Sequence, residues 1–488
     1  MMTNRNALII AGTHSGCGKT TVTLGLMAAL KQRGMTVQPF KCGPDFIDPT
    51  LHLLMTDQVS RNLDVRMCGS DYVQHLFNTH APLAGGPPHE AISVIEGVMG
   101  LFDGGQGSAA TLARLLNLPV LLVVDVRSAA ESVAAVVKGF ESLDPLVQVA
   151  GVIFNRVGSE RHVQMISDAV RKYCRAQIIG ALPRDKTIAL PSRHLGLHMG
   201  TEIELNRQRL IELMEEHLDM DLLLERAQQP KTGTLLIRPE ATEPTLPTSS
   251  LSASSPAPSL LVPPSPDPTS SAPTKVRLGV ARDEAFCFYY QDNFDMLEKV
   301  GAELVFFSPL HDAGLPDGLD CIYLGGGYPE LHAETLTANA SMRAKIQAFS
   351  RSGKPVYGEC GGFMYLTEAI VTAEEKQYPM VGVYPVVSRM QQGLRRLGYR
   401  QVEMQTATIL GAAGSSCYGH EFHYSAIDTM PDEIKRGYVL DDGRIEGYIR
   451  NNTLAGYVHL HWGKTPEAAR HFIQMMRRMQ KQQDINNI

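Results

Sequence analysis

A stretch of thirty residues, from Pro244 to Pro273, constrains this chain more than any other feature. It holds nine prolines and nine serines and almost no charged or aromatic residues. Such a segment cannot bury enough apolar surface to offset the entropy lost on ordering, so we expect a partly extended linker stiffened by proline. The 488 residues then divide into a first half at 1–230, a linker at 231–275 and a second half at 276–488. Function has to be sought in each half.

The composition excludes several classes of protein. Forty-five basic and 51 acidic residues give a net charge of −6, with 44% hydrophobic residues, as in ordinary globular proteins. This balance argues against a nucleic-acid binder. No apolar run reaches the roughly 18 residues of a membrane helix, and residues 1–11 lack the pattern of a signal peptide, so we expect a cytoplasmic protein with no membrane partner. The eight cysteines form no CxxC pair, which indicates free thiols.

Short apolar runs alternate with longer helix-compatible segments in both halves. This alternation predicts an α/β fold with two doubly wound domains built on parallel sheets. Ligands bind at the carboxyl ends of the strands in such sheets, so the residues after each run are the candidates for function. The predicted strands are 7–11, 36–40, 91–95, 119–124, 149–154 and 177–182 in the first half, and 277–281, 303–307, 320–324 and 355–358 in the second.

The first run leads into the sequence GTHSGCGKTT at 12–21 and then into a predicted helix. Such a P-loop directs backbone N–H groups at phosphates, while Lys19 neutralises their charge and Thr20 offers its hydroxyl to Mg²⁺. The sequence therefore predicts binding of ATP with Mg²⁺. The first glycine stands one position early, an offset that resembles the dethiobiotin synthetase branch of P-loop enzymes. The candidate nucleotide-binding residues are Gly12, Gly16, Gly18, Lys19, Thr20, Thr21 and Asn155.

Acidic residues follow the second and third runs. Lys41, Asp45 and Asp48 lie in the sequence PFKCGPDFIDP at 39–49. The two carboxylates are candidates to steer an acceptor group, and Asp48 to bind Mg²⁺; turn formation and helix capping are the alternative. Glu96 ends an apolar run, where a metal-binding carboxylate is expected. Asp103 is either a substrate contact or a turn residue. Asn155, like Arg184, either meets a purine base or belongs to an ordinary loop.

A cysteine in the second half stands where a strand meets a helix. Cys360 lies between glycines in the sequence YGECGGF. A tight turn exposes the sulfur, and a helix N-terminus favours the thiolate, so Cys360 is the candidate nucleophile. His459, in the sequence YVHLHW, is the candidate base. The glycines at 325–327 are candidates for an oxyanion-binding backbone. His461 either orients His459 or packs.

These motifs together resemble a known family. PFKCGPDFIDP, EGVMGLFDG at 96–104 and the offset P-loop resemble the cobyrinate a,c-diamide synthase family of corrin-amidating enzymes. The second half is similar to class I (triad) glutamine amidotransferases. The resemblance implies a P-loop domain followed by an amidotransferase domain, with cobyrinate, L-glutamine and ATP as substrates. It also implies substrate contacts by Phe46, Ile47 and Asp103, although Phe46 stands where the family usually has tyrosine.

Two further motifs have less specific chemistry. The sequence GHEFHYS at 419–425 resembles a corrin-amidase signature, and it either holds glutamine or the macrocycle or is a strand with satisfied polar side chains. The basic residues Arg395, Arg396 and Arg400 either bind substrate carboxylates or form a solvated surface.

The two sites predict one reaction. The first half would phosphorylate the a and c carboxylates of cobyrinate, and ammonia from the second half would attack the acyl phosphate after crossing an internal passage. Lys41, Asp45 and Asp48 would lie between the γ-phosphate and the acceptor. The alternatives are the same chemistry on hydrogenobyrinate or a nickel tetrapyrrole, and a P-loop partitioning ATPase with an inactive appendage. A homodimer is one of the assemblies that the sequence allows for this enzyme.

Overall fold

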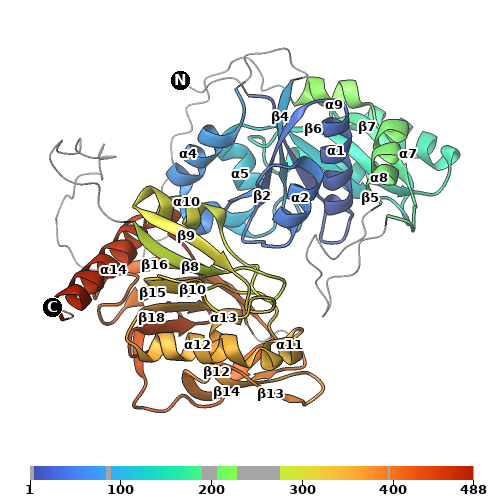
Figure 1. The fold of residues 1–488 in the computed structure, drawn as a ribbon. Coiled ribbons are helices and arrows are strands. Elements are labelled where there is room, and N and C mark those ends of the chain that lie inside the picture. The colour runs from blue at the N-terminus through green and yellow to red at the C-terminus, as the bar shows by residue number, and fades with distance from the viewer. Residues whose placement is uncertain (1–4, 84–89, 189–205, 228–274, 394–395, 487–488) are drawn as a thin grey trace, which may run out of the picture. The chain divides into compact units, whose positions relative to one another are not determined.

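The first half, drawn in blue to green in Figure 1, is built on a parallel sheet of seven strands in the order β3-β2-β4-β1-β5-β6-β7. The computed structural model describes residues 5–83, 90–188, 206–227, 275–393 and 396–486. Each predicted run of the first half forms a strand, whereas β3 was not predicted. The strands are β1 (Ala7–Gly12), β2 (Thr36–Cys42), β3 (Arg61–Leu63), β4 (Ala91–Glu96), β5 (Val120–Asp125), β6 (Val149–Val157) and β7 (Gln177–Pro183).

Helices cover both faces of this sheet because its central strands are apolar on both sides. Ile9 of β1 lies in a buried cluster that includes residues of helices α4 to α7. The next residue, Ile10, lies in a second cluster that includes residues of helices α1, α2, α8 and α9. Successive strand residues point to opposite faces, so a continuous apolar run needs two layers of helices. The helices are α1 (Lys19–Gln32), α2 (Asp48–Thr56), α3 (Val65–Cys68), α4 (Ser70–His80), α5 (Ala109–Leu116), α6 (Val133–Ser142), α7 (Glu160–Tyr173), α8 (Arg207–His217) and α9 (Met220–Arg226).

The second half contains a ten-stranded sheet in the order β21-β16-β15-β18-β19-β20-β11-β10-β8-β9. Its parallel part contains the predicted strands and confirms the α/β prediction: β8 (Val276–Ala281), β9 (Ala302–Phe307), β10 (Cys321–Leu324), β11 (Val356–Glu359) and β20 (Thr453–Gly456). The antiparallel extension of this sheet was not predicted, although a strand was one of the two interpretations of residues 419–425. Its strands are β15 (Arg396–Met404), β16 (Ser416–His423), β18 (Lys435–Leu440), β19 (Ile445–Arg450) and β21 (His459–His461).

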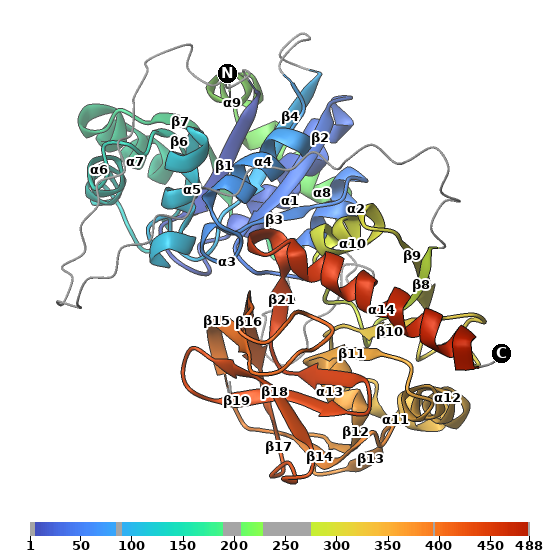
Figure 2. The same cartoon turned by 90° about the vertical axis from the view of Figure 1, so that its left-hand side faces the viewer.

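Helices also cover both faces of the parallel part of this sheet. Leu278 of β8 packs with α10 and α14, whereas Ile322 of β10 packs with α12 and α13. Figure 2 shows α14 and α12 on opposite sides of β10 and β11. A separate sheet follows, with β13 (Gln377–Pro379), β12 (Thr367–Val371), β14 (Tyr384–Met390) and β17 (Ser425–Ile427). The helices are α10 (Gln291–Lys299), α11 (Ala333–Ala338), α12 (Ala340–Arg351), α13 (Gly361–Leu366) and α14 (Glu467–Asn486).

The two halves, residues 1–229 and 276–488, belong to one compact unit. Tyr399 of β15 donates a hydrogen bond to Asp64 Oδ2 over 2.7 Å, and Arg61 pairs with Asp292 of α10. The predicted linker lies outside the described residues except for Lys275. Among the helices of the described ranges, none is long and apolar enough to cross a membrane.

Candidate active sites

The glycine-rich turn joins β1 to α1, as the P-loop prediction requires. Gly16 and Gly18 have φ angles of 82° and 101°, which glycine adopts without strain. A Cβ atom on Gly12 would lie 2.3 Å from the sulfur of Cys17, which is fully buried. The turn thus closes tightly around a small side chain and ends at a helix N-terminus, where backbone N–H groups bind phosphate.

Two side chains around this turn have defined partners. The Lys19 ammonium group donates a hydrogen bond to the His14 carbonyl oxygen over 3.3 Å, so the lysine side chain curls over the turn. Asn155 donates from its amide to the Cys17 carbonyl oxygen over 2.9 Å. A Cβ on Gly18 would lie only 2.0 Å from that amide nitrogen, so Asn155 packs directly on the turn.

A buried cluster of charges lies beside the turn. The Thr20 hydroxyl donates to Glu96 Oε1 over 2.7 Å, and the Lys41 ammonium lies 3.3 Å from the same oxygen and bonds to Asp48. Glu96, Lys41 and Asp48 are each at most 3% exposed. Burial alone would raise the pKa of Glu96, but the charge of Lys41 and hydrogen bonds from His52 and Thr20 hold this pKa well below its usual value. Glu96 is therefore ionised at neutral pH.

Two other predicted carboxylates shape their own turns. Asp45 Oδ1 accepts hydrogen bonds from the amides of Ile47 and Asp48 over 2.8 and 3.0 Å, at the start of α2. Asp103 Oδ2 accepts from the Gly100 amide over 2.8 Å. These contacts favour the alternative role of Asp45 and Asp103, in which they stabilise a turn or cap a helix.

Phe46 packs among rings of the second half. Its ring centroid lies 5.0 Å from that of Phe288, 4.6 Å from that of Tyr290 and 5.0 Å from that of His459. Only 9% of Phe46 is exposed. The residue predicted to contact substrate thus touches the predicted base of the other site.

Cys360 has the geometry of a nucleophile elbow. It joins β11 to α13 with φ at 46°, a conformation that is strained for a residue with a side chain. A Cβ on Gly361 would lie 2.9 Å from the Gly327 amide nitrogen, so the glycine allows close contact with the turn at 325–327. The Gly361 amide at the start of α13 lowers the pKa of the Cys360 thiol, as expected for a helix N-terminus, but burial raises this pKa by more. Attack by sulfur then requires a base.

His459 is suited to that task. The residue is 1% exposed on β21, and burial lowers its pKa well below 6.5, so its imidazole is neutral at neutral pH. A Cβ on Gly326 would lie 2.2 Å from His459 Cε1, so the histidine ring also lies against the glycine turn. The structure thus places the glycine turn in contact with His459 and with the residue after Cys360.

Hydrogen bonds join Cys360 to β20 and its neighbour Glu359 to β21, the strand of His459. The Cys360 amide donates to the Gly456 carbonyl oxygen over 2.8 Å, and the Leu460 amide donates to Glu359 Oε1 over 3.1 Å. Glu359 also accepts from the hydroxyls of Tyr323 and Tyr357 over 2.9 and 2.7 Å. Despite these donors, burial raises the pKa of Glu359 to about 7.

His461 is engaged elsewhere. Its Nε2 lies 3.3 Å from Asp292 Oδ2, and its Nδ1 accepts from the Gly463 amide over 3.0 Å. Asp292 in turn pairs with Arg61 of the first half. Both ring nitrogens thus have partners other than His459, which favours the packing role over the orienting role for His461.

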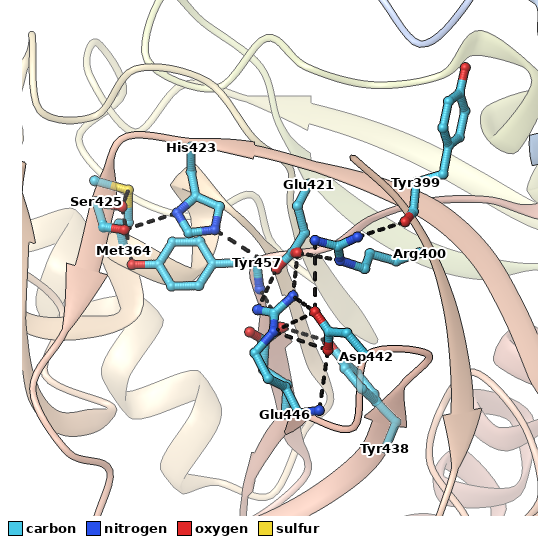
Figure 3. A network of polar contacts seen from close by, with 11 residues as sticks. Met364, Tyr399, Arg400, Glu421, His423, Ser425, Tyr438, Asp442, Glu446 and Tyr457 are labelled. Atoms are coloured by element: carbon cyan, nitrogen blue, oxygen red, sulfur yellow. Dashed lines mark hydrogen bonds and ion pairs between the residues drawn. The ribbon is translucent and has the colours of Figure 1, made fainter. Parts of the chain in front are cut away.

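The motif at 419–425 is a strand whose charged side chains are largely satisfied (Figure 3). Glu421 is fully buried and accepts hydrogen bonds from Arg400 and Arg444 over 2.5 to 2.9 Å. His423 Nδ1 donates to the Ser425 carbonyl oxygen over 2.9 Å, and its ring stacks on Tyr457 with centroids 3.9 Å apart. Arg400 is therefore committed to Glu421, whereas Arg395 lies outside the described residues.

His420 from the same strand approaches the thiol site. Its ring stacks on His459 with centroids 5.2 Å apart, and its Nδ1 bonds to the Tyr290 hydroxyl over 2.9 Å. Burial lowers the pKa of His420 to about 4, so this ring is neutral and adds no positive charge beside His459. This strand therefore supports the base through packing.

Sequence reasoning missed three residues that hold the sites together, namely His52, Asp292 and Glu359. His52 lies four residues after Asp48, the spacing of one helix face, and this pattern could have revealed it. Glu359 directly precedes the nucleophile, but its partner Leu460 is 101 positions away in the sequence. No local pattern predicts such a contact.

The buried charges beside the P-loop could bind Mg²⁺ only if the nucleotide phosphates supply further ligands. Within the described ranges, no group of three or more His, Cys, Asp and Glu residues could hold a metal ion. Thr20 and Glu96 nevertheless offer hard oxygen donors beside the phosphate-binding turn. Magnesium in nucleotide sites commonly takes one or two protein ligands and completes its shell with phosphate oxygens and water, so this donor set fits.

Models of two domain families match the chain in this order. The CobQ/CobB/MinD/ParA nucleotide binding domain matches residues 8–197, and the CobB/CobQ-like glutamine amidotransferase domain matches residues 277–467. The fold and the sites thus define a class of protein in which a nucleotide-binding domain is joined to a glutamine amidotransferase domain.

Full-length relatives define the family more closely. The chain is 41% identical to the cobyrinate a,c-diamide synthase of Dehalococcoides mccartyi (strain CBDB1), covering 96% of this chain and 97% of the relative. It is 39% identical to the enzyme of that name from Priestia megaterium, covering 99% of each chain. The corresponding protein of Listeria monocytogenes serotype 4b (strain F2365) is 42% identical, with 94% and 96% covered. The chain belongs to the cobyrinate a,c-diamide synthase family.

Proposed function

We propose that this chain is a glutamine-hydrolysing ligase that amidates the a and c carboxylates of cobyrinate in cobalamin biosynthesis, using ATP. The observation that carries the proposal is the presence of two complementary sites on one chain. One is a P-loop beside an ionised Glu96, and the other is a cysteine elbow whose glycine turn also contacts a neutral histidine. Relatives with this activity in their names match 94% or more of the chain.

The first site activates the acceptor. A carboxylate is a poor acyl donor because it has no good leaving group. The γ-phosphoryl group of ATP is therefore transferred to a carboxylate oxygen, which gives an acyl phosphate and ADP. Lys19 and the turn amides hold the phosphates, and Thr20 and Glu96 would hold the Mg²⁺, which would neutralise phosphate charge. Lys41 and Asp48 lie beside Glu96, on the side of the turn that we assign to the acceptor.

The second site releases ammonia. His459, neutral at rest, takes the thiol proton of Cys360 as the sulfur attacks the carboxamide carbon of glutamine. The glycine turn and the amide after Cys360 stabilise the oxyanion. His459 returns this proton to the departing nitrogen, so ammonia leaves and a thioester forms, and water then hydrolyses the thioester to glutamate and the free thiol. The ammonia attacks the acyl phosphate with loss of phosphate, and a passage shielded from water would keep it unprotonated.

Product analysis tests this function. Purified protein is incubated with cobyrinate, ATP, Mg²⁺ and glutamine labelled with ¹⁵N in the amide group, and the corrin product is examined by mass spectrometry. We expect a diamide that carries ¹⁵N at both positions, with one ADP and one glutamate formed per amide. A corrin that stays unchanged while glutamine is hydrolysed would contradict the proposal. Hydrogenobyrinate in a parallel reaction tests whether the corrin metal is required.

A further inference from the structure

His52 has no place in the chemistry described so far, yet it contacts Glu96, the carboxylate at the centre of the nucleotide site. It lies on α2 and is fully buried. Its Nε2 lies 2.8 Å from Glu96 Oε2, and its Nδ1 lies 2.9 Å from the Ser60 hydroxyl oxygen. Both ring nitrogens are therefore held, and the orientation of the imidazole is fixed by a bond on each side.

The bond to His52 gives the two oxygens of Glu96 different surroundings. Oε1 accepts from the Thr20 hydroxyl and lies near the Lys41 ammonium, whereas Oε2 bonds to His52. The terminal torsion of a glutamate is broad, so the side chain alone does not fix the plane of the carboxylate. A buried carboxylate oxygen without a partner is also costly. His52 supplies that partner and thereby keeps the other oxygen directed at the P-loop.

Helix α2 connects this contact to the acceptor side of the site. Asp48 stands at the start of the helix and pairs with Lys41, and His52 follows one turn later on the same face. Lys41 itself bridges Asp48 and Glu96. One helix face thus supplies a partner to both members of the Lys41–Glu96 pair, and it follows directly on the turn that contains Asp45.

We propose that His52 is a positioning residue that orients Glu96 for binding of magnesium with the nucleotide. This inference rests on the proposed function, because it takes Glu96 as the carboxylate that holds Mg²⁺. His52 itself does not touch the nucleotide in this assignment and acts through Glu96. Partners of this kind, one shell behind a metal ligand, typically change metal affinity by about 10- to 100-fold when they are replaced.

Two amide substitutions separate the two bonds of His52. In His52→Gln, the longer side chain places its amide where Nε2 stood and can still donate to Glu96. In His52→Asn, the shorter amide stands near the former Nδ1 and reaches Ser60 but not Glu96. Ser60→Ala is the matched control, because it removes the other bond and leaves the contact with Glu96 in place.

The measurement is the affinity for ADP by titration calorimetry, once with Mg²⁺ and once with EDTA, in parallel with thermal unfolding of each variant. We expect His52→Asn to weaken ADP binding in Mg²⁺ by about 10- to 100-fold and to leave binding in EDTA unchanged. His52→Gln and Ser60→Ala should stay within a few-fold of the parent in both conditions. Should His52→Asn fail to fold, His52→Met, which removes both bonds and keeps a long side chain, takes its place.

The outcomes distinguish this inference from the proposed function. Equal losses with and without Mg²⁺ would show a purely structural role and overturn the inference, as would equal effects of His52→Asn and His52→Gln. Glu96→Gln serves as the reference variant. If Glu96→Gln leaves the Mg²⁺ dependence of ADP binding intact, the assignment of Glu96 in the proposed function fails, whatever the His52 variants do.

Discussion

Glu359 accepts a hydrogen bond from the backbone amide of Leu460 over 3.1 Å. The bond joins the residue before the proposed nucleophile, Cys360, to the residue after the proposed base, His459. Cys360 and His459 are 99 positions apart in the sequence, so their relative placement depends on such contacts between β11 and β21.

Breaking this contact should impair glutamine hydrolysis specifically. Glu359→Leu leaves the Leu460 amide and two tyrosine hydroxyls without their acceptor. Because a displacement of about 1 Å in a catalytic group can cost 10²-fold in rate, we expect a loss of glutaminase activity on the order of 10²-fold. Synthesis from free ammonia should stay near the parental rate. Glu359→Gln, which keeps one acceptor, should lose less; equal losses in both variants would argue against positioning by these bonds.

Phe46 should influence the thiol site although it belongs to the first half of the chain. Its ring contacts His459 and Phe288, and the Phe288 amide donates to the Gly326 carbonyl oxygen over 3.0 Å. We expect Phe46→Leu to lower glutamine hydrolysis by about tenfold or more, because the base and the glycine turn both lose a neighbour. Phe77→Leu is the control, because Phe77 of α4 is also a buried ring but packs on Phe40. The contact is unimportant if both variants hydrolyse glutamine equally well.

Glu446 should make stability fall as pH rises. It is 5% exposed, and burial raises its pKa to about 7 from an ordinary value of 4.5. Between these pH values the folded state therefore holds a proton that the unfolded state has already released, so stability falls progressively from about pH 4.5 to about pH 7, by at most about 3 kcal/mol in total.

Denaturant unfolding of Glu446→Gln measures this effect. Glutamine keeps an oxygen for the Tyr457 amide but carries no charge. Relative to the parent, the variant should gain stability at pH 8 and not at pH 4.5. A difference that does not change between these pH values would show that Glu446 does not titrate in this range.

Lys19 should be required for synthesis whatever the source of nitrogen. Lys19→Ala removes the ammonium group at the P-loop, and the loss of one such electrostatic contact costs about 10² to 10³ in rate. Amidation from glutamine and from free ammonia should fall together, as followed by ADP release and product mass. Synthesis that persists in this variant would refute the P-loop assignment. Thr21→Ala, two positions further along α1, is the nearby control and should be milder.

The sequence predicts those parts of the fold that rest on local patterns. The runs that form β1, β2, β4, β5 and β6 are largely apolar and are followed by a glycine, charged or amide residue, so both the parallel sheet and the positions of Glu96 and Lys41 after their runs are predictable. The glycine patterns around Lys19 and Cys360 likewise demand special backbone geometry and reveal their turns. The antiparallel strands β15, β18 and β19 were missed, and β16 was only one of two interpretations of its segment, because polar and apolar residues alternate on these strands only irregularly.

Contacts between distant segments could not be predicted. His461 appeared to be a neighbour for His459 because the two share a strand face, yet its bonds go to Asp292 and Gly463. Arg400 appeared available for a substrate, yet it pairs with the buried Glu421. In both cases the partner is chosen by packing between elements that are far apart in the sequence, and burial of one carboxylate makes that pairing necessary.

The central claim is that two separate sites on this chain make and consume ammonia, and Cys360→Ala tests it most directly. With cobyrinate, ATP and Mg²⁺ present, amide formation is measured once with glutamine and once with a high concentration of ammonium chloride at pH 8. The account predicts no amidation from glutamine and near-parental amidation from ammonia. Loss of both activities in a variant that still folds and binds ATP, or retained use of glutamine, would contradict it.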